Sequence, residues 1–192
     1  MVEKWQKLSS ELVGDHKIFK IRKDRSRSPR TGDDHTFFVL ETGDWINVIP
    51  VTPEGNIVFI HQFRHGTEDV TLEIPGGMAD AEDASFAVSA ARELREETGY
   101  VAEQIVPIGS VAPNPAFLTN RCHTFLALNA VQVGSAQFDG AEDIIVEEIH
   151  GSQIPMLIGS GRITHALVVA AFYHYDHYRR HHQIGIDSHD PY

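Results

Sequence analysis

Short apolar runs separated by turn residues dominate the chain from residue 45 onward. These runs have the length and β-branched content of strands, and they cover residues 45–51, 57–63, 105–112, 122–128 and 144–149. The turn Thr-Pro-Glu-Gly-Asn joins the first two runs and predicts a hairpin. Residues 84–98 and 164–181 instead carry apolar side chains at helical spacing, with Asp83 placed to cap the first helix, and Pro155 should break the segment before the second. The mixture predicts an α/β fold in which helices pack on both sides of a mixed sheet.

The first 42 residues follow a different pattern, dense in charge and poor in apolar runs. Strand-like pieces around residues 17–22 and 36–41 are separated by the turn-rich stretch SRSPRTGDDH. The run from Lys17 to Arg30 is basic and could be a nucleic-acid tail. We favour an exposed hairpin because apolar residues are interleaved with the charges. We therefore expect a small N-terminal β subdomain over residues 1–42 and a main domain over residues 43–192.

Acidic residues gather on one face of the helix expected at 84–98. Glu93, Glu96 and Glu97 stand at positions i, i+3 and i+4, so their carboxylates should project within reach of a common cation. Hard oxygen ligands grouped in this way suit Mg²⁺ or Mn²⁺, which bind few carboxylates and pair with substrate phosphates. The alternative is a solvated helix with an ion pair between Arg92 and Glu96.

The residues on either side of this helix favour the metal site. Gly76 and Gly77 follow Pro75 and let backbone carbonyls approach the acidic face, while Gly99 supplies the left-handed residue that ends a helix. The string from Arg92 to Tyr100, R-E-L-R-E-E-T-G-Y, resembles the second half of the Nudix hydrolase box, R-E-U-x-E-E-x-G-U, in which U is bulky and apolar.

The first half of the box departs from the family pattern. The spacing from Gly77 to Arg92 is one residue longer, and Ala84 stands where the family has an acid. We expect one extra loop residue, with Glu82 or Asp83 replacing the missing acid.

The Nudix resemblance implies a fold, a metal set and a reaction. The fold is an α/β/α sandwich with a mixed sheet. Glu93, Glu96 and Glu97 would hold the metal, with the Gly77 carbonyl as a further ligand, and Glu97 and Arg92 would belong to the catalytic set.

Further strings resemble the branch of the family that cleaves ADP-ribose and nucleoside diphosphate sugars. They are Gln62-Phe63-Arg64 and Glu73-Ile74-Pro75-Gly76-Gly77, and the resemblance places Arg64 and Glu73 near the diphosphate and the terminal ribose. Arg64 could also form a strand-end salt bridge with Glu73. Both roles can hold together.

Two loops complete the expected site. Pro115 lies where ADP-ribose-specific members of this branch have a proline, although Pro113 is close and an ordinary proline-rich connection would look the same. The segment Gly140-Ala141-Glu142-Asp143-Ile144 resembles a G-x-E-D-I element whose glutamate activates the attacking water. Glu142 is therefore the candidate base, with Asp143 and Glu147 as alternatives.

The histidines near the C-terminus permit a second metal site. His174, His177 and His181 could share one helical face and bind a soft divalent ion. A polar face on an amphipathic helix explains them more simply, and His165 at the start of the same helix is expected to be structural.

The composition of the chain limits the kinds of partner that the protein can bind. A net charge of -11 argues against nonspecific binding of nucleic acid or anionic membranes, since both need a positive field. The single cysteine, Cys122, excludes an internal disulfide, and no apolar run reaches membrane-spanning length. We expect a soluble, cytoplasmic protein with no membrane or nucleic-acid partner.

These observations predict Mg²⁺-dependent hydrolysis of ADP-ribose to AMP and ribose 5-phosphate. The alternatives are a GDP-mannose or other nucleoside diphosphate sugar hydrolase, a module that binds ADP-ribose without cleaving it, and an RNA-processing enzyme that uses the basic segment. We also expect a homodimer, because two short strands alone bury too little surface and the resemblance implies that they pack against a second subunit.

Overall fold

The computed structural model describes residues 1–137 and 143–182. The chain forms two compact units. Residues 1–44 and 112–121 make the first unit, and the second contains residues 45–111 together with the chain from residue 122 onward.

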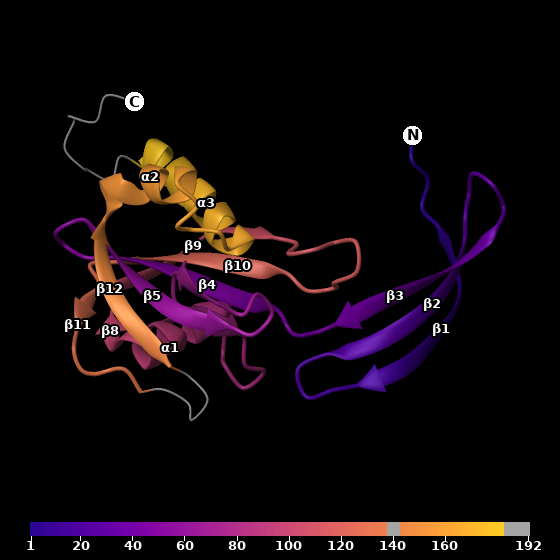
Figure 1. Cartoon of the computed structure of the whole chain (residues 1–192), viewed down its shortest axis with the longest axis horizontal. Helices are drawn as coiled ribbons and strands as arrows, with labels where there is room; N and C mark the ends of the chain where they lie inside the picture. Colours follow the sequence, from indigo (N-terminus) through magenta and orange to yellow (C-terminus); the bar gives the residue numbers. More distant parts are fainter. Residues whose placement is uncertain (138–142, 183–192) are drawn as a thin grey trace. The chain divides into compact units, whose positions relative to one another are not determined.

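The first unit is built on an antiparallel sheet of order β1-β2-β3 (Figure 1). Its strands are β1 (Gln6–Asp15), β2 (Lys20–Arg27) and β3 (Asp34–Glu41). β1 was absent from the sequence prediction, because its exposed polar residues have no clear alternation. The basic run from Lys17 to Arg30, expected to be an exposed hairpin, contains β2 as the middle strand of this antiparallel sheet. β2 is paired on both edges, and its Asp24 is buried where it accepts a 2.7 Å hydrogen bond from Ser10.

The second unit contains a mixed sheet of order β12-β5-β4-β10-β9. Its strands are β4 (Trp45–Val51), β5 (Asn56–Arg64), β9 (Gln104–Val111), β10 (Cys122–Leu128) and β12 (Ile144–His150). β4 and β10 are parallel, whereas the other neighbours along this order are antiparallel.

The expected hairpin of β4 and β5 is present only beside its turn. The two strands pair directly at Val51 and Ile57. Further along, short strands that the sequence did not predict take these edges: β6 (Asp69–Glu73) pairs with β5, and β7 (Gly76–Met78) pairs with β4. β8 (Tyr100–Val101) and β11 (Val131–Gln132) form a separate two-stranded pair. The glycine turn, residues 74–77, leads from β6 into the first residues of β7 and is thereby fixed against the central strand β4.

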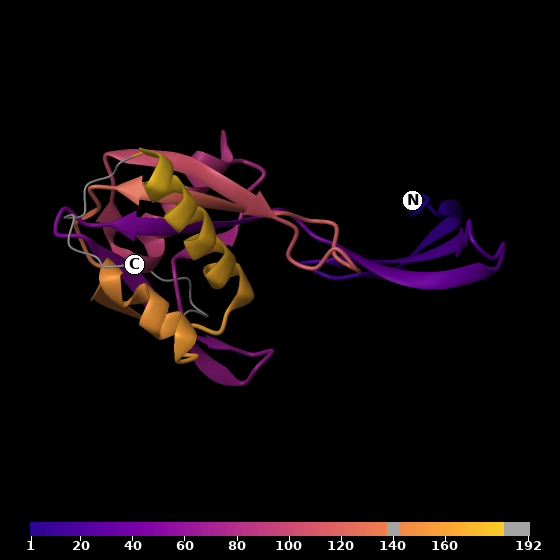
Figure 2. The same cartoon turned by 90° about the horizontal axis from the view of Figure 1, so that it is seen from above.

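Helices cover both faces of this sheet, as predicted. α1 (Phe86–Thr98) lies on one face, and α2 (Ile154–Gly159) and α3 (Ala166–His182) lie on the other (Figures 1 and 2). Leu94 of α1 is fully buried in one hydrophobic cluster with Val48, and Phe172 of α3 belongs to a second cluster with Phe59. The arrangement is an α/β/α sandwich, and each buried face stabilises the helix that packs on it.

The helix ends correct two expectations. Ser85, not Asp83, caps α1, and its hydroxyl accepts the Val88 amide at 3.3 Å. Pro155 does not break the chain; it occupies the first turn of α2, following the 3₁₀ turn Gly151–Gln153, because a proline there loses no helical hydrogen bond. Across the described residues, no helix is both long and apolar enough to cross a membrane.

Candidate active site

The acidic face of α1 meets the glycine turn between β6 and β7. The Glu97 carboxylate is 3% exposed and accepts the Gly76 N–H at 2.9 Å. Glu93 lies against Gly77 so closely that a Cβ atom at Gly77 would stand 2.7 Å from Glu93 Oε1. A side chain at Gly77 would therefore displace Glu93, which explains why glycine is needed at this turn.

Arg92 organises the outer side of the same helix. Its Nη1 is 3.0 Å from Glu93 Oε1 and 2.8 Å from Glu96 Oε2, and its Nε donates to Asp83 Oδ2 at 3.2 Å. Burial alone would lower the pKa of Arg92, but the charges of Glu93, Glu96 and Asp83 outweigh it and raise the pKa. The guanidinium is therefore a fixed positive charge between the loop and the acidic face.

Asp83 supplies the acid that the longer loop displaces. Its side chain is 15% exposed and contacts Arg92, whereas Glu82 is exposed. Of the two replacements considered from the sequence, Asp83 therefore supports the loop.

Arg64 and Glu73 form the ion pair that the sequence allowed. Arg64 Nε donates to Glu73 Oε1 and Nη2 donates to Oε2, both at 2.7 Å, and the Thr71 hydroxyl donates to Oε1 at 2.6 Å. Burial raises the pKa of Glu73, but the hydrogen bonds from Arg64 and Thr71 exceed that effect and hold it below its ordinary value. The Glu73 carboxylate is thus charged and locked, and it fixes the orientation of Arg64.

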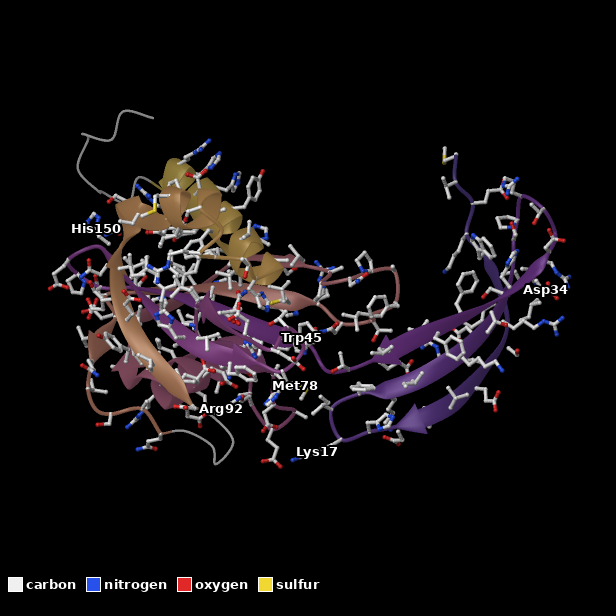
Figure 3. The ribbon with its side chains drawn as sticks, in the orientation of Figure 1. Lys17, Asp34, Trp45, Met78, Arg92 and His150 are labelled. Carbon is white, nitrogen blue, oxygen red and sulfur yellow. The ribbon has the colours of Figure 1, made fainter. Side chains whose placement is uncertain are left out.

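A pocket of about 320 Å³ lies beside these groups. Trp45 and Met78, register partners on β4 and β7, belong to its wall and are labelled with Arg92 in Figure 3. The full lining consists of Trp45, Ile46, Asn47, Arg64, Glu73, Ile74, Gly76, Gly77, Met78, Cys122, His165, Leu167 and Val168.

Not every expected site residue belongs to this pocket. Arg64, Glu73 and Gly77 do, but Glu93 and Glu97 contact the glycine turn from α1 without lining the pocket, and Glu96, which pairs with Arg92, does not line it either. Pro115 is not in the lining either and belongs to the first unit. Glu142 lies outside the described residues.

Glu93 and Glu97 supply carboxylate oxygens, the kind of ligand that a divalent cation takes in proteins. Glu93 and Glu97 both reach the glycine turn, and the space that a Cβ atom at Gly77 would fill is occupied by the Glu93 carboxylate. Within the part of the chain that the structure describes, no three His, Cys, Asp or Glu side chains are grouped as a metal cluster. The carboxylates are instead held by Arg92 and Gly76, so a cation would have to compete with these partners.

The C-terminal histidines have other contacts. The His174 ring packs on Gly109, where a Cβ atom would come within 2.4 Å of it. His181 Nδ1 is 2.7 Å from the His177 carbonyl oxygen, and their rings lie 4.1 Å apart.

The sequence did not predict several pocket residues. Trp45 and Asn47 come from β4, Cys122 from β10 and His165 from the residue before α3, and no local motif marked them. Only the position of His165 at the start of a predicted helix gave a signal, and that signal indicates a structural residue.

Comparison with known proteins identifies the family. The family model described as the NUDIX domain matches residues 41–149, more than half of the chain. The chain belongs to the Nudix family. The Nudix box lies within the matched region, and Nudix hydrolases generally require a divalent metal ion.

Two relatives and one solved structure place this Nudix protein more closely. It is 30% identical over 130 residues to an ADP-ribose pyrophosphatase of Mycobacterium tuberculosis, a match that covers 68% of this chain and 62% of the relative. It is 25% identical over 174 residues to a GDP-mannose pyrophosphatase of Yersinia enterocolitica, covering 85% and 90% of the two chains. The first of these two matches spans less than two thirds of the length of the M. tuberculosis protein.

The structural comparison agrees with the family. A crystal structure described as an ADP compounds hydrolase superimposes with a TM-score of 0.83 over 94% of this chain and 96% of its own, at 18% identity. At that identity the match establishes the fold.

Proposed function

We propose that this protein hydrolyses the diphosphate bond of ADP-ribose to give AMP and ribose 5-phosphate. The observation that carries the proposal is the contact of Glu93 and Glu97 with Gly76 and Gly77, two glycines that line the same pocket as Arg64. Cleavage of a diphosphate needs compensation of phosphoryl charge and a correctly placed water, and it needs no protein nucleophile. The relationship to an ADP-ribose pyrophosphatase supports this choice of substrate.

Each residue has a distinct part in this scheme. Glu93, Glu96, Glu97 and the Gly77 carbonyl would hold Mg²⁺, for which Mn²⁺ could substitute. When bound, the ion supplies charge neutralisation on the phosphoryl oxygens and lowers the pKa of a coordinated water. Arg92 maintains the acidic face through its ion pairs with Glu93 and Glu96.

The substrate side of the scheme depends on the second arginine and on loops. Arg64, oriented by Glu73, would contact the diphosphate. Pro115 would shape the sugar or adenine pocket. Glu142 would accept a proton from the attacking water.

A single pair of variants tests the chemistry. Glu97→Gln removes one negative charge yet keeps a side-chain oxygen that can accept the Gly76 N–H. We expect kcat for ADP-ribose with Mg²⁺ to fall by at least about 10²-fold, equivalent to several kcal/mol of lost charge stabilisation. Glu103→Gln is the matched control, because Glu103 is an exposed carboxylate bonded to Asn129. Equal activity of the two variants across a Mg²⁺ titration would remove Glu97 from the metal set.

The second candidate is hydrolysis of GDP-mannose, which the Y. enterocolitica relative favours. Chromatography of the products from ADP-ribose, GDP-mannose, NADH, diadenosine polyphosphates and oxidised nucleoside triphosphates separates the candidates. We expect kcat/KM for ADP-ribose to exceed that for GDP-mannose by at least roughly 10-fold, the equivalent of one unpaired hydrogen bond. The reverse order would favour the second candidate. Calorimetric binding of ADP-ribose without formation of AMP would indicate a binding module.

We further propose that the protein is a homodimer whose N-terminal sheet contacts a second copy. The sheet exposes Leu12, Phe37 and Phe38, and Trp5, directly before β1, is exposed as well. Trp5 packs edge-on against Phe37, with ring centroids 5.3 Å apart, so part of this surface is already ordered.

Phe37→Glu should shift full-length protein toward monomer in sedimentation velocity at micromolar concentration. Met156→Glu, at a 55% exposed apolar residue of the second unit, is the control. A wild-type monomer would refute the dimer. A point variant is preferable to deletion of residues 1–42, because Leu40 of β3 pairs with the segment 112–121 through Phe117.

The proposed partners are nucleoside diphosphate sugars and a second copy of the chain. The net charge of -11 supports the absence of a nucleic-acid partner. Cys122 is the chain's single cysteine and is buried, which is compatible with the reducing conditions of the cytoplasm, where we place the protein.

A further inference from the structure

His165 lies where the last helix begins at the wall of the pocket. Its carbonyl oxygen accepts the N–H groups of Val168 and Val169 at 3.0 and 3.1 Å, and its ring Nδ1 accepts the Leu167 N–H at 3.2 Å. His165 is therefore the N-terminal cap of α3. Asn47 of β4 donates to the Leu167 carbonyl at 3.4 Å, which holds this turn on the central sheet.

The cap determines which ring nitrogen carries the proton. A neutral imidazole has one acceptor and one donor nitrogen, so a ring whose Nδ1 accepts a backbone N–H presents Nε2 as a donor. His165 Nε2 is 3.8 Å from Glu73 Oε2. That separation exceeds hydrogen-bond length, and both residues line the pocket.

Glu73 presents an acceptor beside this donor. Its Oε1 receives the Arg64 Nε–H and the Thr71 hydroxyl, while its Oε2 receives one Arg64 bond. Each carboxylate oxygen has about two lone-pair sites, so Oε2 retains capacity for another donor. A donor and an acceptor 3.8 Å apart can share one bridging atom: an oxygen about 2.8 Å from each would subtend an angle of about 85°.

The chemistry of the bridging atom follows from the two groups. A phosphoryl oxygen could accept from His165, but its negative charge would be repelled by Glu73. A hydroxyl both accepts and donates, so it satisfies His165 and Glu73 together. We propose that His165 and Glu73 form a pair that recognises one hydroxyl of the substrate's sugar, which makes His165 a specificity-determining residue. This inference rests on the proposed nucleotide-sugar hydrolysis.

Two substitutions separate recognition from capping. His165→Asn keeps a good capping acceptor but removes the Nε2 donor. His165→Gln places an amide donor at a similar reach and should recover part of the recognition. The matched control is His150→Asn, since His150 Nδ1 also accepts a backbone N–H, that of Ser152 at 3.3 Å. His150 lies far from the pocket residue Trp45 in the same unit (Figure 3).

The first experiment measures kcat/KM for ADP-ribose and for analogues that each lack one hydroxyl of the terminal ribose. Wild type and His150→Asn should cleave one of these analogues at least roughly 10-fold less efficiently than ADP-ribose. In His165→Asn this ratio should fall to roughly 1–3, and His165→Gln should lie between the two. Full wild-type discrimination in His165→Asn for every analogue would overturn the inference.

The second experiment observes binding without turnover. ¹⁵N NMR spectra of the histidine rings are recorded with ADP-ribose in excess EDTA, and the His165 Nε2 signal should shift while that of His150 stays in place. A shift at His165 in a protein that hydrolyses no nucleotide sugar would support the inference and refute the proposed function. Hydrolysis of ADP-ribose with an unshifted His165 signal would refute the inference alone, and the absence of both would refute both.

Discussion

The ion pair between Arg64 and Glu73 should respond unequally to the loss of either partner. The Glu73 side chain is 4% exposed, whereas that of Arg64 is 40% exposed. Arg64→Gln therefore leaves a buried carboxylate without its cation, a change that costs about 3–5 kcal/mol in other proteins. Glu73→Gln leaves a guanidinium that water can reach and an amide oxygen that still accepts from it, so we expect a loss of about 1–2 kcal/mol. The free energy of unfolding should fall more for Arg64→Gln.

The dependence of stability on pH offers a second test of this unequal response of the Arg64–Glu73 pair. The pKa of Glu73 is lowered in the folded protein, so its contribution to stability is fully present above the unfolded value of about 4.3 and is lost as pH falls through the folded value. In Arg64→Gln the burial of Glu73 remains without the compensating cation, so its pKa should rise above the ordinary value. That variant should gain stability relative to wild type as the carboxyl group takes up a proton. The difference in free energy of unfolding between wild type and Arg64→Gln should therefore become smaller as pH falls from 7 toward 4.

Urea unfolding followed by circular dichroism at pH 7, 5.5 and 4 measures both effects. Arg180→Gln is the matched control, because Arg180 pairs with Asp176 on α3 at 74% and 52% exposure and should contribute less than about 0.5 kcal/mol. Equal losses for Arg64→Gln and Glu73→Gln at pH 7, or a pH-independent cost of Arg64→Gln, would show that burial does not control this pair.

Two further predictions concern the turn and the start of α1. Gly77→Ala should lower kcat at least about 10-fold and cost about 1–3 kcal/mol of stability, because its Cβ atom would displace Glu93; Gly66→Ala, which meets nothing within 4 Å, should change neither. Ser85→Ala should lower the free energy of unfolding, measured with urea, by about 1 kcal/mol through loss of the α1 cap. The same loss in Asp83→Ala, with no loss in Ser85→Ala, would show that Asp83 is the cap.

Periodicity predicted the helices and the core strands because burial on one face leaves a regular trace in the sequence. α1 and α3 each pack a stripe of apolar residues on the sheet, and the strands they cover are nearly continuous apolar runs. Leu94 and Phe172, buried on opposite faces, mark the two stripes. Glu93, Glu96 and Glu97 lie on α1, the helix that this periodicity predicted, but the partner of each carboxylate depends on the fold.

Elements with little burial left no such trace. β1 is almost wholly exposed and is held by backbone pairing to β2, which any sequence can supply. β7 contains only Gly76, Gly77 and Met78, and its place beside Trp45–Asn47 is a matter of tertiary pairing. The sequence could suggest the ion pair of Arg64 with Glu73. It could not predict that His165 lies beside this pair, because that position also depends on tertiary structure.

The longer loop of the Nudix box shows which parts of the motif are structurally fixed. Gly77 is held by the pairing of β7 with β4, and Arg92 is held by α1, which packs on the same sheet. An extra residue must therefore be absorbed between them, where the chain is a largely exposed turn region before Ser85. Asp83 still reaches Arg92 from this region, with 3.2 Å between Asp83 Oδ2 and Arg92 Nε. Asp83 thus meets the end of a long arginine side chain, whereas Glu93 and Glu97 meet the backbone of Gly77 and Gly76, so the position of the loop acid is less narrowly fixed than the positions of these two glutamates.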